Sequence, residues 1–373
     1  MKRIGVVLGL VGCGFTPSSL TQGDDDANLG DGRMHDAQID ASPDAWYAGY
    51  HYRKPITVTT ALTGPLTDFP LGLVRTQDPQ IAAHASGQDL VVTAGDAITP
   101  LDRELVTSMV DGTIELWVRV PQLGAGAQTL YLYYGGSAAT SSTSMWANNA
   151  GVWHLSDVGP MVVDSSINHN ALGAPGPMQQ PMSKPGIAGT ARQYDGNDDT
   201  FSTTDPQNGS LDMGTSSFSY SMWLNVATPN STFDTPFWKG GTSNGEIGFC
   251  ILTGTTWYAK IHDGTHFADP SLGTQAAFAN KWIHVAAVLD RGAQTFTAYA
   301  NGAMVNSQST TTIGTLDNSL DFDLGRTHNN FPYKGLIDEV RLYRTVLTPE
   351  WIAAEHSNLA DPSFVVFGAE EMH

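Results

Sequence analysis

The feature that most constrains the fold is a two-residue alternation of apolar and polar side chains. Ile114, Leu116, Val118 and Val120 fall on one face of an extended segment, and residues 218–224 alternate in the same way. The chain also has 39 Gly and 20 Pro but only 15% charged residues, which argues against long solvent-exposed helices. The sequence therefore predicts an all-β protein rich in turns.

The N-terminus has the composition of an export signal. Lys2 and Arg3 precede a short apolar run, 4–11, which is far shorter than the roughly 20 residues of a membrane-spanning helix. Residues 10–13, Leu-Val-Gly-Cys, resemble a bacterial lipobox, and this resemblance implies cleavage before Cys13 and acylation of its thiol. The alternative is an ordinary secretory signal with a cysteine by chance. Both interpretations predict an exported protein, and the first predicts a lipid anchor at the bacterial cell envelope.

Residues 14–45 are acidic and carry almost no apolar pattern, so we expect a disordered linker between the anchor at residues 1–13 and the folded part. The whole chain has a formal net charge of −19. Nucleic acids and anionic lipid surfaces need clustered Lys and Arg, so neither is expected as a partner. Contact with a membrane is expected through the lipid anchor alone.

Two β-rich domains are expected after the linker, at residues 46–147 and 148–373. The first contains strand-like segments separated by turn signals and no helix of normal length, which predicts a small β-sandwich. Three of these segments resemble a bacterial extracellular domain of unknown function, and this resemblance implies no activity. The segments that carry this resemblance are 50–58, 116–121 and 130–135.

The second domain contains five separated motifs in the order found in the concanavalin A-like lectin/glucanase superfamily, and it resembles the laminin-G-like (LamG-like) jelly-roll branch. The motifs lie at 152–155, 164–170, 218–224, 282–288 and 335–343. The resemblance implies two antiparallel sheets packed face to face. One short helix is expected after Thr348 and Pro349, and residues 364–367 are expected to add a closing strand to this domain.

A structural calcium ion (Ca²⁺) is one expectation from this resemblance. In members that bind calcium, the aspartates of two motifs come close, which here means Asp164 and Asp338. Oxygens of Asn168 and Asn170 could complete the shell, because calcium prefers carboxylate, amide and carbonyl oxygens. The alternative is that Asp164 caps a turn and Asp338 accepts backbone hydrogen bonds.

Catalysis is the less favoured interpretation, and no catalytic residue is assigned. Glucanases of the superfamily carry Glu-x-Asp-x-x-Glu on one strand, a pattern that this sequence lacks. Asp338 and Glu339 are adjacent, so a regular strand would direct them to opposite faces.

Sugar binding requires an exposed aromatic side chain beside polar groups. Candidates for such a ligand-binding role lie on strands or in polar segments of the second domain: Trp223, Trp238, Trp257, Tyr258 and His266. The alternative for each Trp is burial in the sandwich core. Cys250 lies in an apolar run and is expected to be a buried structural thiol.

The leading hypothesis is a non-catalytic cell-surface lipoprotein that binds extracellular glycan through the jelly roll. The alternative is an adhesion module that binds a surface protein, and a weaker one is a divergent glycoside hydrolase. Jelly rolls host many functions, so the fold by itself does not name the ligand.

Overall fold

The computed structural model describes residues 45–142, 144–227, 234–241, 245–251, 255–327 and 331–373. The signal segment, Cys13 and residues 14–44 of the linker lie outside the described residues. The described part is all-β with antiparallel sheets, which confirms the predicted fold class. Residues 39–373 form one compact unit.

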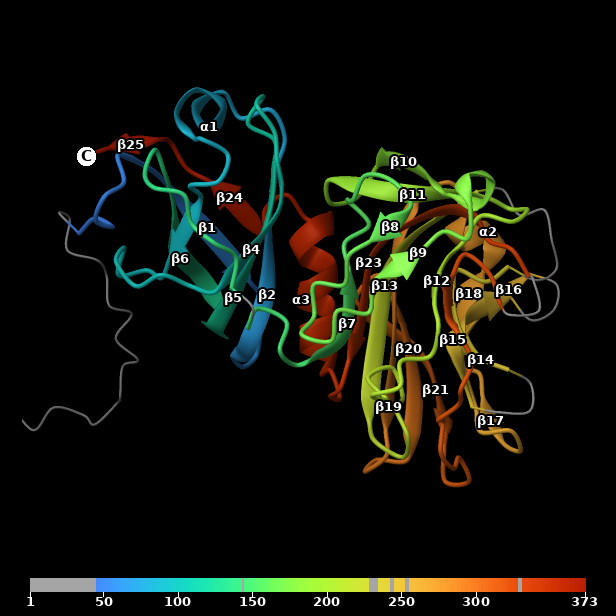
Figure 1. Ribbon diagram of the computed structural model, residues 1–373. Helices are drawn as coiled ribbons and strands as arrows, with labels where there is room; N and C mark the ends of the chain where they lie inside the picture. The colour runs from blue at the N-terminus through green and yellow to red at the C-terminus, as the bar shows by residue number, and fades with distance from the viewer. Residues whose placement is uncertain (1–44, 143, 228–233, 242–244, 252–254, 328–330) are drawn as a thin grey trace, which may run out of the picture. The chain divides into compact units, whose positions relative to one another are not determined.

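The first β-rich part packs two sheets against each other around an apolar core (Figure 1). The five-stranded sheet has the order β24-β1-β6-β3, with β25 also paired to β1, and the three-stranded sheet has the order β2-β5-β4. Their bounds are β1 Tyr52–Thr60, β2 Leu66–Arg75, β3 Val91–Thr93, β4 Arg103–Ser108, β5 Ile114–Leu123, β6 Gly126–Tyr134, β24 Val365–Phe367 and β25 Glu371–Met372.

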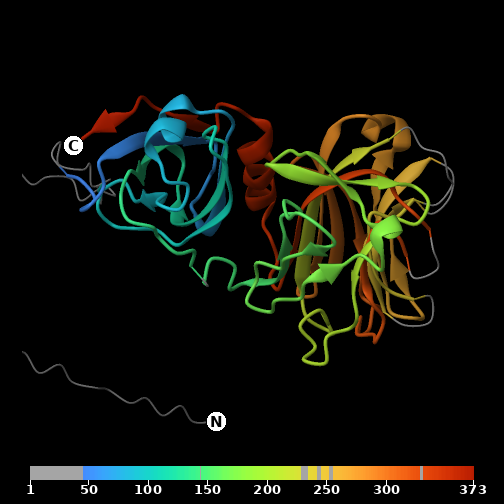
Figure 2. The same cartoon turned by 45° about the horizontal axis from the view of Figure 1, so that its top comes forward.

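The C-terminal strand forms as expected, but in a different sheet from the one expected. Residues 365–367 form the expected strand, but it pairs with β1, with Ile56 opposite Phe367. Figure 2 shows this red segment alongside the blue β1. The first β-rich part is therefore built from both ends of the folded chain, and the closing strand belongs to its sheet rather than to the jelly roll.

The second β-rich part consists of two sheets that enclose a larger apolar core. One has eight strands in the order β10-β11-β23-β13-β19-β20-β21, with β7 paired to β23. The bounds of this sheet are β7 Asn149–Trp153, β10 Met182–Pro185, β11 Thr190–Asp195, β13 Phe218–Val226, β19 Trp282–Asp290, β20 Thr295–Ala300, β21 Ala303–Ser309 and β23 Lys334–Tyr343.

The other sheet has nine strands in the order β17-β16-β15-β14-β22-β12-β9-β8, with β18 paired to β16. Its bounds are β8 Met161–Val162, β9 Leu172–Gly173, β12 Phe201–Thr203, β14 Phe237–Gly240, β15 Glu246–Ile251, β16 Thr256–His262, β17 Phe267–Ala268, β18 Ser271–Thr274 and β22 Phe322–Leu324. Alternate side chains of both sheets enter the core between them, as the sequence pattern predicts.

The expected helix is α3, Pro349–Ala360, and the Thr348 hydroxyl caps it by accepting from Trp351 N. The structure adds α1, Pro79–His84, α2, Gln275–Phe278, and a 3-10 turn, η1, Pro177–Gln179. None of the helices in the described ranges is long and apolar enough to cross a membrane.

Helix α3 connects the two β-rich parts. Ala354 joins the core of the first part, whereas Ile352 packs against residues of the eight-stranded sheet. Asn358 forms two buried hydrogen bonds with the Gly72 backbone of β2: its Oδ1 accepts from Gly72 N at 2.7 Å, and its Nδ2 donates to Gly72 O at 3.0 Å. Gly72 is required there because an added Cβ would lie 2.8 Å from the Trp117 ring.

Asn358→Ala is expected to lower the free energy of unfolding by about 2 kcal/mol, because two buried backbone groups would lose their partners. Chemical denaturation of the full chain measures this. Ser357→Ala, at a half-buried position of the same helix turn, is the matched control with an expected change within about 0.5 kcal/mol. Equal stabilities of the two variants would contradict the role of Asn358.

Candidate functional site

A β-bulge in β23 places two adjacent carboxylates on the same side of the sheet. The register with β13 shifts between Ser221 and Trp223, and Glu339 has a positive φ of 48°. Ile337 and Val340 both enter the core, so Asp338 and Glu339 lie together on the outer side. The expectation that these two carboxylates face opposite sides is therefore wrong, because the extra residue resets the alternation.

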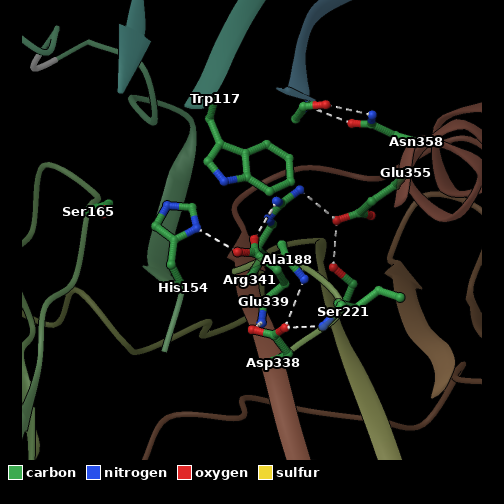
Figure 3. Close-up of polar contacts among 12 residues, drawn as sticks. Trp117, His154, Ser165, Ala188, Ser221, Asp338, Glu339, Arg341, Glu355 and Asn358 are labelled. Atoms are coloured by element: carbon green, nitrogen blue, oxygen red, sulfur yellow. Dashed lines mark hydrogen bonds and ion pairs between the residues drawn. The ribbon is translucent and has the colours of Figure 1, made fainter. Parts of the chain in front are cut away.

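Arg341 is the central cation of a buried cluster on this outer side (Figure 3). Its guanidinium donates to Glu339 Oε2 at 2.7 Å and to Glu355 Oε1 of α3 at 3.1 Å. The guanidinium carbon also lies 4.2 Å from the ring centroid of Trp117 and 5.0 Å from that of Trp146. The jelly roll, α3 and the first β-rich part therefore contribute to one charged cluster.

His154 is the second cation of the cluster. Its Nδ1 lies 2.8 Å from Glu339 Oε1, and its Nε2 lies 3.3 Å from Glu104 Oε2. Glu115 of β5 lies beside this ring, 3.7 Å from Nδ1, and accepts a hydrogen bond from Ser156. A protonated imidazole between two carboxylates satisfies both ring nitrogens.

The charges in the cluster shift several pKa values. Burial opposes a charge on His154, yet Glu339 and Glu104 raise the pKa of the imidazole well above its usual range. Burial, together with the charge of Glu339, raises the pKa of Glu115 to about 8. Burial and the same neighbour raise the pKa of Asp338 well above its usual range. At neutral pH the cluster therefore holds a proton on Glu115.

The donor set of Glu115, His154 and Glu339 also has the composition of a metal site, because one ligand atom from each lies within 4.8 Å of the others. The Arg341 guanidinium contacts Glu339, however, and His154 already bridges two carboxylates. A further cation would meet these two positive groups. The arrangement fits an ion-pair network that joins the two β-rich parts better than a metal centre.

Of the two predicted calcium-binding carboxylates, Asp164 lies in a loop and Asp338 on β23, and both accept backbone hydrogen bonds. Asp164 accepts from the backbone amides of Val152, Ser166 and Asn170 at 2.8–2.9 Å. Asp338 Oδ2 accepts from the amides of the 187–188 turn at 2.8 and 3.1 Å.

The two asparagines donate to neighbouring oxygens: Asn168 Nδ2 to Ala150 O, and Asn170 Nδ2 to Ser210 Oγ. No hydrogen bond within the described residues joins the Asp164 turn to Asp338. These contacts match the alternative of turn capping, and the calcium site stays a prediction.

Three of the five predicted ligand-binding side chains are buried. Trp223, Trp238 and Trp257 are 3%, 5% and 0% exposed. Trp223 lies under α3, where its ring stacks on His356 with centroids 5.6 Å apart, and Trp257 belongs to the core. None of the three offers an exposed platform. Tyr258 is half-buried and His266 is exposed, and they stay candidates.

The outer face of the nine-stranded sheet gathers polar and aromatic side chains around Trp238. Because Phe237 and Phe322 enter the core, alternation directs their neighbours Trp238 and Asp323, which pair across β14 and β22, to the outer face. The Trp238 ring lies on Gly248 of β15, where an added Cβ would lie 2.5 Å from it.

Strands β15 and β16 extend this outer face. Their core residues alternate with outward side chains, which are Glu246, Cys250, Tyr258, Lys260 and His262. Lys260 Nζ and His262 Nδ1 lie 3.8 and 3.5 Å from Glu246 Oε2. Cys250 is buried and burial raises its pKa to about 12, which confirms the expected inert thiol.

Burial raises the pKa of two carboxyl groups on this face. Burial raises the pKa of Asp323 to about 6, and Arg326, 3.8 Å away, offsets only part of this effect. Burial also raises the pKa of Glu246, against the opposing charge of Lys260.

The sequence reasoning did not single out Asp323, Glu246, Lys260 or His262. For Glu246, Lys260 and His262, the sequence signal is the two-residue alternation of 246–250 and 256–262, which places these polar residues on the face opposite to the apolar ones. The pairing of β14 with β22, which joins Trp238 to Asp323, is long-range and leaves no local pattern.

Comparisons with known proteins agree with this architecture. Residues 195–353 match the family model described as the concanavalin A-like lectin/glucanases superfamily. No curated protein matches the chain.

Among solved structures, the binding domain of Paraclostridial Mosquitocidal Protein 1 is 15% identical, with 56% of this chain and 52% of that chain covered and a TM-score of 0.46. The binding domains of botulinum neurotoxin serotypes G and D are 14% and 16% identical, each with 56% of this chain and 50% of that chain covered and a TM-score of 0.46. The chain thus spans about half the length of these solved chains, and the likeness concerns the fold alone. Residues 195–353 therefore carry a concanavalin A-like domain within an all-β chain.

Proposed function

We propose that this chain is an exported, lipid-anchored protein that binds extracellular glycan without catalysis, through the outer face of the nine-stranded sheet. The observation that carries the proposal is the arrangement of Tyr258, Lys260 and His262 on that face, beside Trp238 and Asp323. The concanavalin A-like match supports ligand binding in general. The anchor at Cys13 and an extracellular place follow from the N-terminal sequence alone.

The chemistry of this face suits a sugar. Sugar rings present apolar C–H faces bordered by hydroxyl groups, so they pack on an aromatic ring while neighbouring polar groups bind the hydroxyls. Tyr258 is half-buried, and the side chains of Lys260 and His262 are 16% and 17% exposed, so all three are partly fixed by packing yet reachable. Partly fixed side chains lose little freedom when a ligand binds.

A glycan and polysaccharide array probed with the full chain tests this function, once with calcium and once with chelator. We expect binding to a defined glycan, and a loss of at least tenfold in affinity for Tyr258→Ala and for His262→Ala. His51→Ala, an exposed histidine of the first β-rich part, is the matched control and is expected to bind as the unmodified chain does. Binding lost with chelator would support the calcium site at Asp164 and Asp338. Absence of binding both with calcium and with chelator would contradict glycan binding.

A protein partner is the second candidate function, and it is favoured by a set of exposed apolar side chains in one stretch of the chain. Val158, Met161, Val163, Met178 and Met182 are all at least half exposed. Exposed Met residues adapt to varied protein surfaces. Binding to a surface protein that survives Tyr258→Ala but not Met178→Glu would favour this alternative.

A further inference from the structure

Phe267 is the one exposed aromatic side chain among the Phe, Tyr and Trp residues of the described ranges. It is 60% exposed, whereas the others are buried or half-buried. It lies on β17, at the edge of the nine-stranded sheet (Figure 1). An apolar ring that faces solvent gains free energy when it packs against the apolar surface of a ligand.

The strand register places this ring on the proposed glycan face. Phe267 pairs with His262 of β16, and the neighbouring pair is Ile261 with Ala268. Ile261 and Ala268 both enter the core, so alternation directs Phe267 and His262 to the outer face. Their ring centroids are 6.5 Å apart. The exposed ring therefore belongs to the same surface as the polar side chains of β16.

Hydrogen-bonding groups lie beside the ring. Lys260 Nζ lies 5.5 Å from the centroid of the Phe267 ring. It is 3.8 Å from Glu246 Oε2, which is longer than a hydrogen bond, and no hydrogen bond joins this ammonium to another of the described residues. Burial, together with the charge of Lys260, lowers the pKa of His262, so this imidazole is neutral and offers one donor and one acceptor. A ligand on the ring can therefore accept a hydrogen bond from Lys260.

The charge around the ring favours a neutral ligand. Glu246 lies 3.8 Å from the ammonium of Lys260, and Asp263 directly follows His262. Burial opposes a charge on Asp263, but hydrogen bonds from three backbone amides lower the pKa of this carboxyl group, so it stays ionised. The chain as a whole carries −19. An anionic ligand would be repelled as it approached, whereas a neutral one would not.

The length of the surface favours an oligosaccharide. Strand β16 pairs regularly with β15 from Trp257 to His262. At about 3.3 Å per residue, Tyr258 lies about 13 Å from His262 along the strand, so a single sugar ring cannot contact both Phe267 and Tyr258. A protein partner would need about 800 Å² on each side, and one exposed ring among half-buried neighbours offers much less apolar area.

We propose that this edge of the sheet binds a neutral oligosaccharide, with the apolar face of one pyranose on the Phe267 ring and an oxygen of that sugar accepting from Lys260. The assignment rests on the proposed glycan function and names its class of ligand. Tyr258 contacts a later sugar of the same oligosaccharide. Phe267 thus supplies the exposed aromatic platform that the three buried Trp candidates do not.

The test is a glycan array probed with the full chain. The array carries neutral oligosaccharides of glucose, galactose and mannose, and the same oligosaccharides capped by a uronic or sialic acid. We expect binding to a neutral oligosaccharide and weaker binding to its acidic counterpart. Phe267→Ala and Phe267→Leu are expected to lower the affinity about tenfold, because neither side chain has a ring on which a sugar can stack. Phe267→Tyr keeps the ring and is expected to bind as the unmodified chain does.

Met304→Ala is the matched control, because Met304 is 64% exposed and lies on β21 of the other sheet. All these positions are exposed, so the variants are expected to fold. Absence of binding to every glycan would contradict the proposed function together with this inference. Binding that is lost in Tyr258→Ala but survives Phe267→Ala and Phe267→Leu would keep the proposed function and overturn the role of Phe267. Tighter binding of the acidic counterparts would overturn the neutral class of ligand.

Discussion

Arg341→Leu is expected to lower the free energy of unfolding by about 3–5 kcal/mol, because it leaves buried carboxylates without their cation. Arg341 is 2% exposed and donates to Glu339 and Glu355, which are also buried. The substitution also removes the cation that lies over the rings of Trp117 and Trp146. Leucine fills part of the volume of the arginine side chain, so the loss of unfolding free energy reports mainly on the unpaired charges.

Chemical denaturation at neutral pH, followed by tryptophan fluorescence, measures this loss. Arg75→Leu is the matched control, because Arg75 forms an ion pair with Asp78 but its side chain is 46% exposed. Asp78 is buried but keeps Lys54 Nζ, 3.0 Å away, as its partner, so the control is expected to change stability little. Similar losses in both variants would show that the buried cluster does not hold the two β-rich parts together.

Most of the fold could be predicted from local pattern. The alternation at 114–120 and 218–224 became β5 and β13, and Thr348 with Pro349 marked the start of α3. These features depend on neighbours within a few residues, which a sequence shows directly. The all-β class followed from them, whereas the jelly roll was implied by the resemblance of five motifs to the concanavalin A-like superfamily.

Long-range pairing explains what the sequence did not reveal. Residues 365–367 have the composition of a strand, but nothing local shows that they pair with β1 more than 300 positions earlier, as the 318-residue separation of Arg53 and its partner Glu371 illustrates. Trp223 has polar neighbours on its strand face, yet α3 covers that face and buries it. Burial of an aromatic side chain depends on such distant elements.

The 337–343 motif contains one feature that the sequence predicts and one that it does not. Its pattern predicted a strand of the jelly roll, and β23 is that strand. The bulge at Glu339 could not be read from the residue types, because a positive φ at a Glu is rare and is imposed by the surroundings. His154 and Arg341, which both contact Glu339, supply that constraint. The motif therefore contains Asp338, Glu339 and Arg341, but the sequence does not show that the two carboxylates lie on the same side of the sheet.

Glu115→Gln is expected to flatten the pH dependence of stability between about pH 4.5 and 8. Glu115 is buried, and its pKa in the folded state is raised to about 8, from an ordinary value of 4.5. Between these two values the folded chain holds a proton that the unfolded chain releases. The free energy of unfolding therefore falls as the pH rises from 4.5 to 8, by about 1.4 kcal/mol per pH unit, relative to its value below pH 4.5.

The measurement is the free energy of unfolding at several pH values for the unmodified chain and for Glu115→Gln. The amide cannot titrate, so the stability of the variant relative to the unmodified chain is expected to increase with pH across this window and to level off above it. Asp323, on the nine-stranded sheet, titrates in both proteins and cancels in the difference, whereas the charge of Glu115 helps to raise the pKa of Asp338, so the difference also includes this change at Asp338. Glu350→Gln is the control, since Glu350 is exposed and its curve is expected to parallel that of the unmodified chain.

Parallel curves for Glu115→Gln and the unmodified chain would mean that Glu115 is already ionised at neutral pH. Two cations, His154 and Arg341, would then face one more buried negative charge beside Glu339. A sloping difference would show instead that Glu115 of β5 holds a proton beside the charge of Glu339 of β23. Loss of that proton places two like charges in a buried site, where solvent screens them little. The contact between the two parts would then weaken at alkaline pH before either core unfolds.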